Sequence, residues 1–330
     1  MSSMLLKPMG IGQLIDRSFQ LYRKHFVKLV LIMLILFGPI YLLQSLLLTN
    51  EQPTGSTSIF EQLQEDASFE EMMLAISENT NTMDIWQVVL FFLVVLPVLL
   101  LIVAPVAVSS IVFMVRAFLS GDTIPEVGEL LRRSFSRLGP LAGSTVLVGL
   151  IWFGIYIVTA IALTLMIIAG ALIAGVMNGF EGAGPGAGLI IFMVLGGIIL
   201  FFGFALLLSF FVIRFGYYLP FVALGEESIG IGRSWRITRK SFWRLFLMYL
   251  VLSIVIYIFI IVITLLLAFV MGDGLVPQLL QSLVTIVLMP LWIIPYTLSF
   301  FDLKARNEGT GLEALIQSTI QDNEPITAHE

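Results

Sequence analysis

The chain of 330 residues contains no cysteine and few charged residues. The absence of cysteine excludes disulfides, thiolate metal ligands, a cysteine nucleophile and lipidation through a cysteine at either end. Charged residues make up only 12% of the sequence, whereas hydrophobic residues make up 58% and the mean hydropathy is +1.03. This balance lies far outside that of soluble globular proteins. The composition therefore predicts an integral membrane protein.

Ionisable residues are missing from six stretches that are each long enough to cross a bilayer as a helix, which takes about 20 apolar residues. The stretches lie between Lys28 and Glu51, Asp84 and Arg116, Arg137 and Glu181, Glu181 and Arg214, Arg244 and Asp273, and Asp273 and Asp302. The third stretch has 43 residues. Its length alone would allow two spans, so the number of crossings needs an independent criterion.

The positions of the basic residues provide that criterion. If residue 1 is cytoplasmic and each stretch crosses once, the cytoplasmic segments contain all 17 Lys and Arg residues. Two crossings in the third stretch would place the basic residues from Arg214 to Arg244 outside, against the positive-inside rule. The sequence therefore predicts an all-α integral membrane protein with six transmembrane helices and both termini in the cytoplasm. An acidic insertion at 49–84 would lie outside the cytoplasm.

A short motif recurs before each odd-numbered span. It reads Arg17-Ser18-Phe19, Arg133-Ser134-Phe135 and Arg233-Ser234-Trp235. Around the first two copies the apolar residues have the spacing of one helical face, which predicts an amphipathic helix on the cytoplasmic membrane surface. Thr123 and Glu126 have the spacing of a capping box, which predicts that the second such helix begins directly after the preceding span. We therefore expect three related helical hairpins, each preceded by an interfacial helix.

The even-numbered spans share helix breakers and similar ends. Their breakers are Pro97, Pro105, Gly203, Pro290 and Pro295, which predict kinks. Each span is followed by a predicted turn of an acid and a glycine, at Gly121-Asp122, Gly225-Glu226 and Glu308-Gly309. One membrane domain, 1–330, would then consist of units 1–121, 122–224 and 225–309 and a flexible tail, 310–330.

Three stretches resemble the family named for the membrane domain of glycerophosphoryl diester phosphodiesterase, a group of bacterial polytopic membrane proteins. They are residues 12–23, residues 232–238 with Phe242-Trp243, and residues 301–309. The resemblance implies a bacterial cytoplasmic-membrane protein that supports, recruits or regulates another component. Phosphodiesterase members carry a catalytic barrel that depends on histidines and metal-binding carboxylates. This chain has only His25 and His329, so the enzymatic activity is not expected here.

Candidate sites are few, because no predicted span contains an ionisable residue. That pattern disfavours ion-coupled transport and intramembrane proteolysis. We predict no catalytic, cofactor-binding or metal-binding residue and no nucleic-acid partner. Arg17, Arg133 and Arg233 have two interpretations. They set topology and attract anionic lipid at about 1 kcal/mol per basic residue, or they form a specific site for an anionic phospholipid headgroup or for an unknown membrane or cytoplasmic protein.

Aromatic residues near the ends of the spans are predicted to form interfacial belts. They include Trp86, Tyr217, Tyr218 and Trp243. Taken together, the sequence favours a non-enzymatic accessory, scaffold or lipid-associated membrane module. The alternative is a transporter or exporter of an uncharged or amphipathic small molecule, because repeated hairpins and broken helices recur in transport folds.

Overall fold

The structure, a computed structural model, describes residues 9–48, 85–178, 187–271 and 275–322. Within these ranges the chain is helical apart from short turns and contains no strand. Six helical segments are long and apolar enough to cross a membrane, which confirms the predicted number. They are Phe26–Ser45, Phe91–Ser120, Leu138–Ala162, Leu195–Leu224, Phe242–Met271 and Val276–Asn307. The predicted acidic insertion at 49–84 lies outside the described residues.

Each odd-numbered span follows a short helix. The pairs are α1 (Ile11–Lys24) with α2 (Phe26–Leu48), α8 (Val127–Phe135) with α9 (Leu138–Asn178), and α12 (Ile231–Thr238) with α13 (Phe242–Met271). On α1, Leu14, Ser18 and Leu21 are buried, whereas most of its polar side chains are exposed. The long third stretch forms a single continuous helix of 41 residues, α9.

The even-numbered spans are interrupted helices. The second consists of α5 (Ile85–Leu90), the π-helix η1 (Phe91–Val95), α6 (Leu96–Val98), the π-helix η2 (Leu99–Val103) and α7 (Ala104–Ser120). The fourth consists of α10 (Ala187–Gly216) and α11 (Tyr218–Leu224), and the sixth of α14 (Leu275–Leu288) and α15 (Pro290–Asp322). The irregular turns around Pro97 follow from proline, which lacks an N–H and clashes with the preceding turn.

The break in the fourth span differs from the prediction. Helix α10 continues without interruption through Gly203, and the helix breaks at Tyr217 instead. Glycine retains its backbone N–H and does not clash with the preceding turn, so it weakens a helix without ending it. The break follows instead from Pro220, the third residue of α11, which lacks an N–H and clashes with the carbonyl four residues earlier, that of Gly216.

Two of the three predicted acid-and-glycine turns are confirmed. Gly121 and Gly225 both have φ of 72° and end α7 and α11. The N–H of the acid after each glycine donates to a carbonyl five residues earlier at 3.0 Å, which is a Schellman end. The third predicted turn is wrong, because α15 continues through Glu308-Gly309. No proline occurs from 296 to 324 to stop it, so residues 310–322, assigned to a tail from sequence, are helical.

The predicted capping box before α8 is also wrong. Helix α8 begins at Val127 with Glu126 as its N-cap, and the cap makes no side-chain hydrogen bond. A box starting at Thr123 would need Ile124 in helical conformation. Ile124 precedes Pro125, and the proline ring disfavours that conformation. The Lys28 ammonium instead holds this connection by donating to the carbonyl oxygens of Ile124 at 3.2 Å and Pro125 at 3.3 Å.

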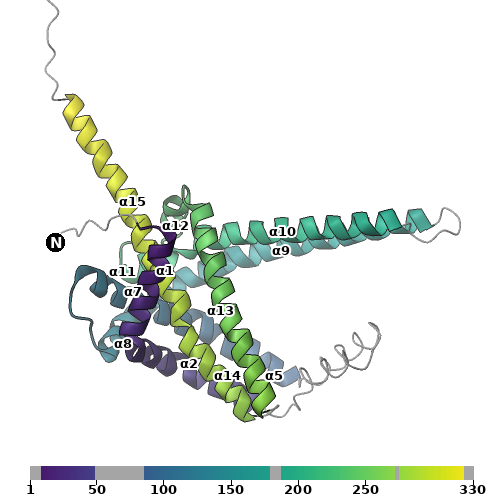
Figure 1. The fold of residues 1–330 in the computed structure, drawn as a ribbon, viewed down its shortest axis with the longest axis horizontal. Helices are drawn as coiled ribbons and strands as arrows, with labels where there is room; N and C mark the ends of the chain where they lie inside the picture. Colours follow the sequence, from purple (N-terminus) through teal and green to yellow (C-terminus); the bar gives the residue numbers. More distant parts are fainter. Residues whose placement is uncertain (1–8, 49–84, 179–186, 272–274, 323–330) are drawn as a thin grey trace, which may run out of the picture.

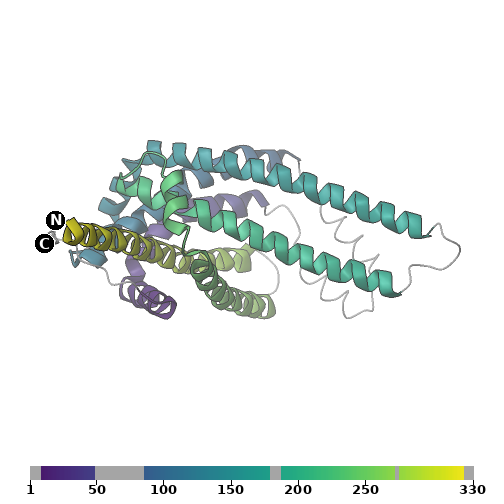
Figure 2. The ribbon, with the colours of Figure 1, turned by 90° about the horizontal axis from the view of Figure 1, so that it is seen from above.

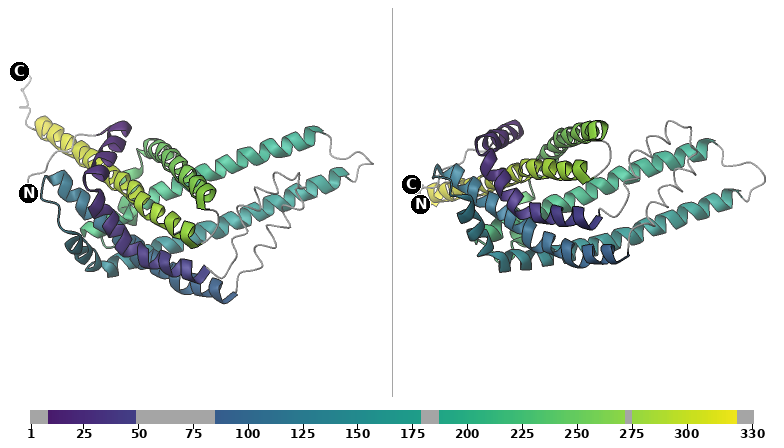
Figure 3. Two further views of the ribbon diagram at one scale, coloured as in Figure 1. Left: turned by 60° about the horizontal axis from the view of Figure 1, so that its bottom comes forward. Right: turned by 90° about the horizontal axis from the view of Figure 1, so that it is seen from below.

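Helices α7 and α15 lie at the centre of the bundle (Figure 1). Helix α7 packs against α2, α8, α9, α11 and α15, and small fully buried residues such as Ala107, Ser109 and Ser110 allow these close approaches. The short helices α1, α8 and α12 gather at one end of the molecule. Helices α9 and α10 diverge from the other spans and extend beyond them at the opposite end (Figures 2 and 3).

The start of α1 is fixed to the sixth span. The Met9 N–H donates to Asp302 Oδ1 at 2.7 Å, and the Met9 carbonyl accepts from Arg306 at 2.8 Å and Arg244 at 3.2 Å. Asp302 is 1% exposed and also forms ion pairs with both arginines. Helix α1 packs along α15, so the first short helix lies against the last span.

Candidate functional site

The three arginines singled out by the sequence have different surroundings. Arg17 is exposed on α1, and Arg133 is exposed on α8, where it pairs with Glu129 at 2.5 Å. Arg233 on α12 is about one-third exposed and lies 3.4 Å from Glu227. Arg233 lines a cavity of about 370 Å³ to which neither Arg17 nor Arg133 contributes. That cavity is therefore not the common site predicted for all three.

The third copy of the motif has a different helical register. Counted from the first residue of the helix, Ser18 and Ser134 are the eighth residues of α1 and α8, whereas Ser234 is the fourth residue of α12. The eighth residue of α12 is Thr238. Ser18, Ser134 and Thr238 are buried, and each hydroxyl donates to the carbonyl four residues earlier at 2.7 to 2.9 Å. Because Gly230 sets the start of α12, the third motif lies one turn earlier than the first two.

In the second and third copies the motif serine connects the short helix to the preceding span. Ser134 Oγ lies 2.9 Å from Ser110 Oγ of α7. Ser234 Oγ accepts from the Tyr217 N–H at 3.1 Å and donates to the Arg214 carbonyl at 2.7 Å. These two backbone groups flank the break between α10 and α11. Ser234 thus provides the partners that a continuous helix would otherwise supply.

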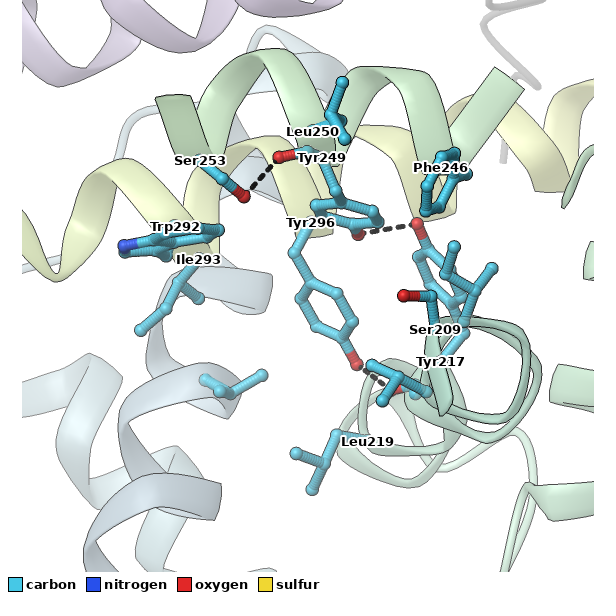
Figure 4. A pocket seen from close by; sticks show the side chains of 14 residues that line it. Ser209, Tyr217, Leu219, Phe246, Tyr249, Leu250, Ser253, Trp292, Ile293 and Tyr296 are labelled. Carbon is cyan, nitrogen blue, oxygen red and sulfur yellow. Dashed lines mark hydrogen bonds between the residues drawn. The ribbon is translucent and has the colours of Figure 1, made fainter. Parts of the chain in front are cut away.

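Beside this break lies a cavity of about 580 Å³, which we call the tyrosine-lined cavity (Figure 4). Its walls come from α10, α11, α13 and α15, with one residue of α7. Most lining side chains are apolar, and among the described residues that line it there is no Asp, Glu, Lys, Arg or His. Its hydroxyl groups belong to Ser209, Ser253, Tyr217, Tyr249 and Tyr296.

The tyrosines form a connected cluster. The Tyr217 hydroxyl lies 2.7 Å from the Tyr249 hydroxyl and 2.7 Å from Ser299 Oγ. The Tyr296 hydroxyl donates to the Gly216 carbonyl at 2.6 Å, and its ring stacks on that of Tyr217 with centroids 5.1 Å apart. Figure 4 shows these rings, contributed by three different spans, lying next to one another. Hydrogen bonds thus fix the polar groups in an otherwise apolar wall.

The predicted aromatic belt is wrong for Tyr217 and Tyr218. Their exposed fractions are 1% and 7%, whereas Trp86 is 74% exposed and Trp243 is 68% exposed. An aromatic residue near a span end suits both a belt and a buried contact, so sequence position did not distinguish them. The only sequence signal for the cluster was the presence of hydroxyl residues in three spans, and that signal does not show which faces meet.

The arrangement suits a molecule with an apolar part and a few polar atoms. Apolar walls favour hydrocarbon, and a tyrosine or serine hydroxyl both donates and accepts hydrogen bonds. Within the described part of the chain, no group of three His, Asp or Glu residues is placed to hold a metal ion.

Comparisons with known proteins gave no match: no family model, no curated protein and no solved structure matches the chain.

Proposed function

We propose that the protein is a non-enzymatic, multi-pass membrane module that binds a lipid or a similarly amphipathic molecule in the tyrosine-lined cavity. It acts as an accessory or scaffold component of a bacterial cytoplasmic membrane, with both termini in the cytoplasm. The observation that carries the proposal is the cavity itself. Its volume of about 580 Å³ lies within the range of small-molecule sites, and its lining combines apolar side chains with fixed hydroxyl groups.

The relation to the phosphodiesterase membrane-domain family and the three related hairpins are part of this proposal. The three related hairpins are supported by the packing of each short helix against an even-numbered span, whereas the family relation rests on the sequence resemblance alone. Helix α8 packs against α7, α12 against α10, and α1 against α15. The last pairing joins the first short helix to the last span. A contact between the first and third units is expected when three similar units are arranged around one centre.

Photo-cross-linking with a phospholipid that carries a diazirine in its acyl chain tests cavity binding. We expect cross-links on the peptides of α13 and α15 that contain Tyr249 and Trp292, which line the cavity. Filling the cavity with Ser253→Phe should abolish these cross-links. Thr264→Phe is the matched control, because Thr264 lies on the same helix, is exposed and also donates its hydroxyl to a carbonyl four residues earlier. Equal cross-linking of both variants would refute the proposal.

The orientation is tested by cysteine labelling, which is clean because the chain has no cysteine. A cysteine introduced as Ser56→Cys should react with a membrane-impermeant reagent in intact cells. Reaction only after lysis would contradict the proposed orientation.

The second candidate function is transport of an uncharged or amphipathic small molecule. One observation favours it: the helix breaks at Tyr217 and near Met289 both adjoin the tyrosine-lined cavity. Broken helices commonly border substrate sites in transporters. Flux of a fluorescent amphipathic probe through sealed vesicles that contain the protein, lost in Ser253→Phe, would favour transport over static binding.

A further inference from the structure

A second cavity, of about 600 Å³, lies where α10, the turn between α12 and α13, and α15 meet. We call it the basic cavity. Its described lining includes five basic side chains and no acidic one. The basic residues are Arg214, Arg239, Lys240, Arg244 and Arg306. None of them belongs to the repeated arginines that the sequence analysis singled out.

Arg214 distinguishes this cavity from a general accumulation of positive charge. It is 7% exposed, and its terminal nitrogens donate to the carbonyl oxygens of Trp235 at 3.4 Å and Arg239 at 3.2 Å. Its guanidinium carbon lies 4.9 Å from the centre of the Phe210 ring. Its Nε is buried and has no hydrogen-bond partner within the described structure. The hydrogen bonds and the ring contact thus hold a guanidinium rigidly in the wall of the cavity.

Among the described residues, the charged side chains that line the basic cavity are all basic. Arg244 and Arg306 both pair with Asp302. Arg239 and Lys240 are exposed beside them. A lining of this charge favours an anionic ligand and disfavours the cationic end of a zwitterionic one.

The remaining walls indicate that the anion is attached to a lipid. Phe210, Phe242 and Trp243 line the cavity, and Trp243 is 68% exposed at the start of the fifth span. The ring of Phe242 stacks on that of Phe246, with centroids 5.9 Å apart, and Phe246 lines the tyrosine-lined cavity. The two cavities thus adjoin along α13. The basic cavity matches a charged headgroup, and the adjoining tyrosine-lined cavity matches an apolar chain.

We propose that the basic cavity binds the phosphate of an anionic phospholipid, with the acyl part extending along α13 towards the tyrosine-lined cavity. This inference rests on the proposed lipid binding and adds the class of headgroup. Arginine guanidinium groups donate pairs of hydrogen bonds to phosphate oxygens, and Arg214, Arg239 and Arg244 line this one cavity.

Native mass spectrometry tests the headgroup preference. The purified protein is exposed to equal amounts of phosphatidylglycerol and phosphatidylcholine, and the bound ratio is measured. The test variant Arg239→Gln/Lys240→Gln removes two exposed charges of the basic cavity. A charge-assisted hydrogen bond to phosphate is worth on the order of a tenfold change in affinity, so we expect the preference for phosphatidylglycerol to fall at least about tenfold.

The matched control is Arg116→Gln/Arg132→Gln, which removes two exposed charges, from α7 and α8, outside the cavity. It should change the preference less than about twofold if binding is specific. Equal losses in the two double variants would overturn the inference. So would displacement of phosphatidylglycerol by an equal concentration of inorganic phosphate, which would identify a soluble-anion site.

The inference and the proposed function can fail separately. If cross-linking in the tyrosine-lined cavity is lost in Ser253→Phe but the Arg239→Gln/Lys240→Gln variant keeps its headgroup preference, only the headgroup inference is wrong. If Ser253→Phe leaves cross-linking unchanged, the proposed function is wrong. The headgroup inference is then also wrong in its account of the acyl chain.

Discussion

Replacing Ser234 with alanine tests whether α12 holds open the break in the fourth span. Ser234 is 0% exposed, and its hydroxyl bonds both the Tyr217 N–H and the Arg214 carbonyl. Alanine removes both partners and leaves two backbone groups at the break without them. A buried backbone group deprived of its partner costs about 1–3 kcal/mol. Because the break borders a cavity and the two groups can partly relax, we expect a loss of about 2–4 kcal/mol.

The measurement is the free energy of unfolding in mixed micelles, from titration with a denaturing detergent followed by tryptophan fluorescence. Ser209→Ala is the matched control. Ser209 lies on the same span, but its hydroxyl donates only to the Ala205 carbonyl within its own helix. Its loss should cost less than about 0.5 kcal/mol.

Two results would refute this reasoning. Equal stabilities of the Ser234→Ala and Ser209→Ala variants would show that the backbone at the break does not depend on α12. A large loss in Ser209→Ala would show that any lost hydroxyl in this span is destabilising. In either case Ser234 would not be a residue that stabilises the break.

Three further predictions concern the same end of the bundle. Asp302→Asn should lower the free energy of unfolding by about 3 kcal/mol. This is the low end of the cost of breaking a buried ion pair, because Arg244 and Arg306 retain some solvent contact. Limited proteolysis should then cut near Met9 faster, and an unchanged cleavage rate would contradict a role of Asp302 in holding Met9. Burial, with smaller contributions from the ammonium groups of Lys24 and Lys28, lowers the pKa of His25. The free energy of unfolding should therefore be highest above about pH 6.5, where the histidine of the unfolded chain is neutral, and should fall as the pH drops towards the lowered pKa. This pH dependence should disappear in His25→Phe. If it remains in that variant, another group causes it. Tyr217→Phe should lower the free energy of unfolding by about 1 kcal/mol, because it removes two interhelical hydrogen bonds. The control is Tyr257→Phe at an exposed tyrosine. Equal losses in the two variants would show that the tyrosine cluster does not stabilise the fold.

The sequence by itself determined the features that depend on local chemistry and on the solvent. Spans follow from the number of consecutive apolar residues, because each backbone in the bilayer must satisfy its own hydrogen bonds as a helix. The interruption at Pro290 and the left-handed ends at Gly121 and Gly225 also follow from single residue types. The repeated motif contains Ser134 and Ser234, whose contacts join short helices to the preceding spans, and the role of the neighbouring arginines stays a prediction.

Only the tertiary structure decided which helix faces meet. The tyrosine cluster, the contact of α1 with α15 and the basic cavity all join residues from at least two elements distant in sequence. In a soluble helix, the apolar stripe marks the buried face. In these spans nearly every face is apolar, because lipid is as suitable as protein for most side chains. The pattern that reveals a span therefore carries little information about its neighbours, and packing and a few buried hydrogen bonds select them.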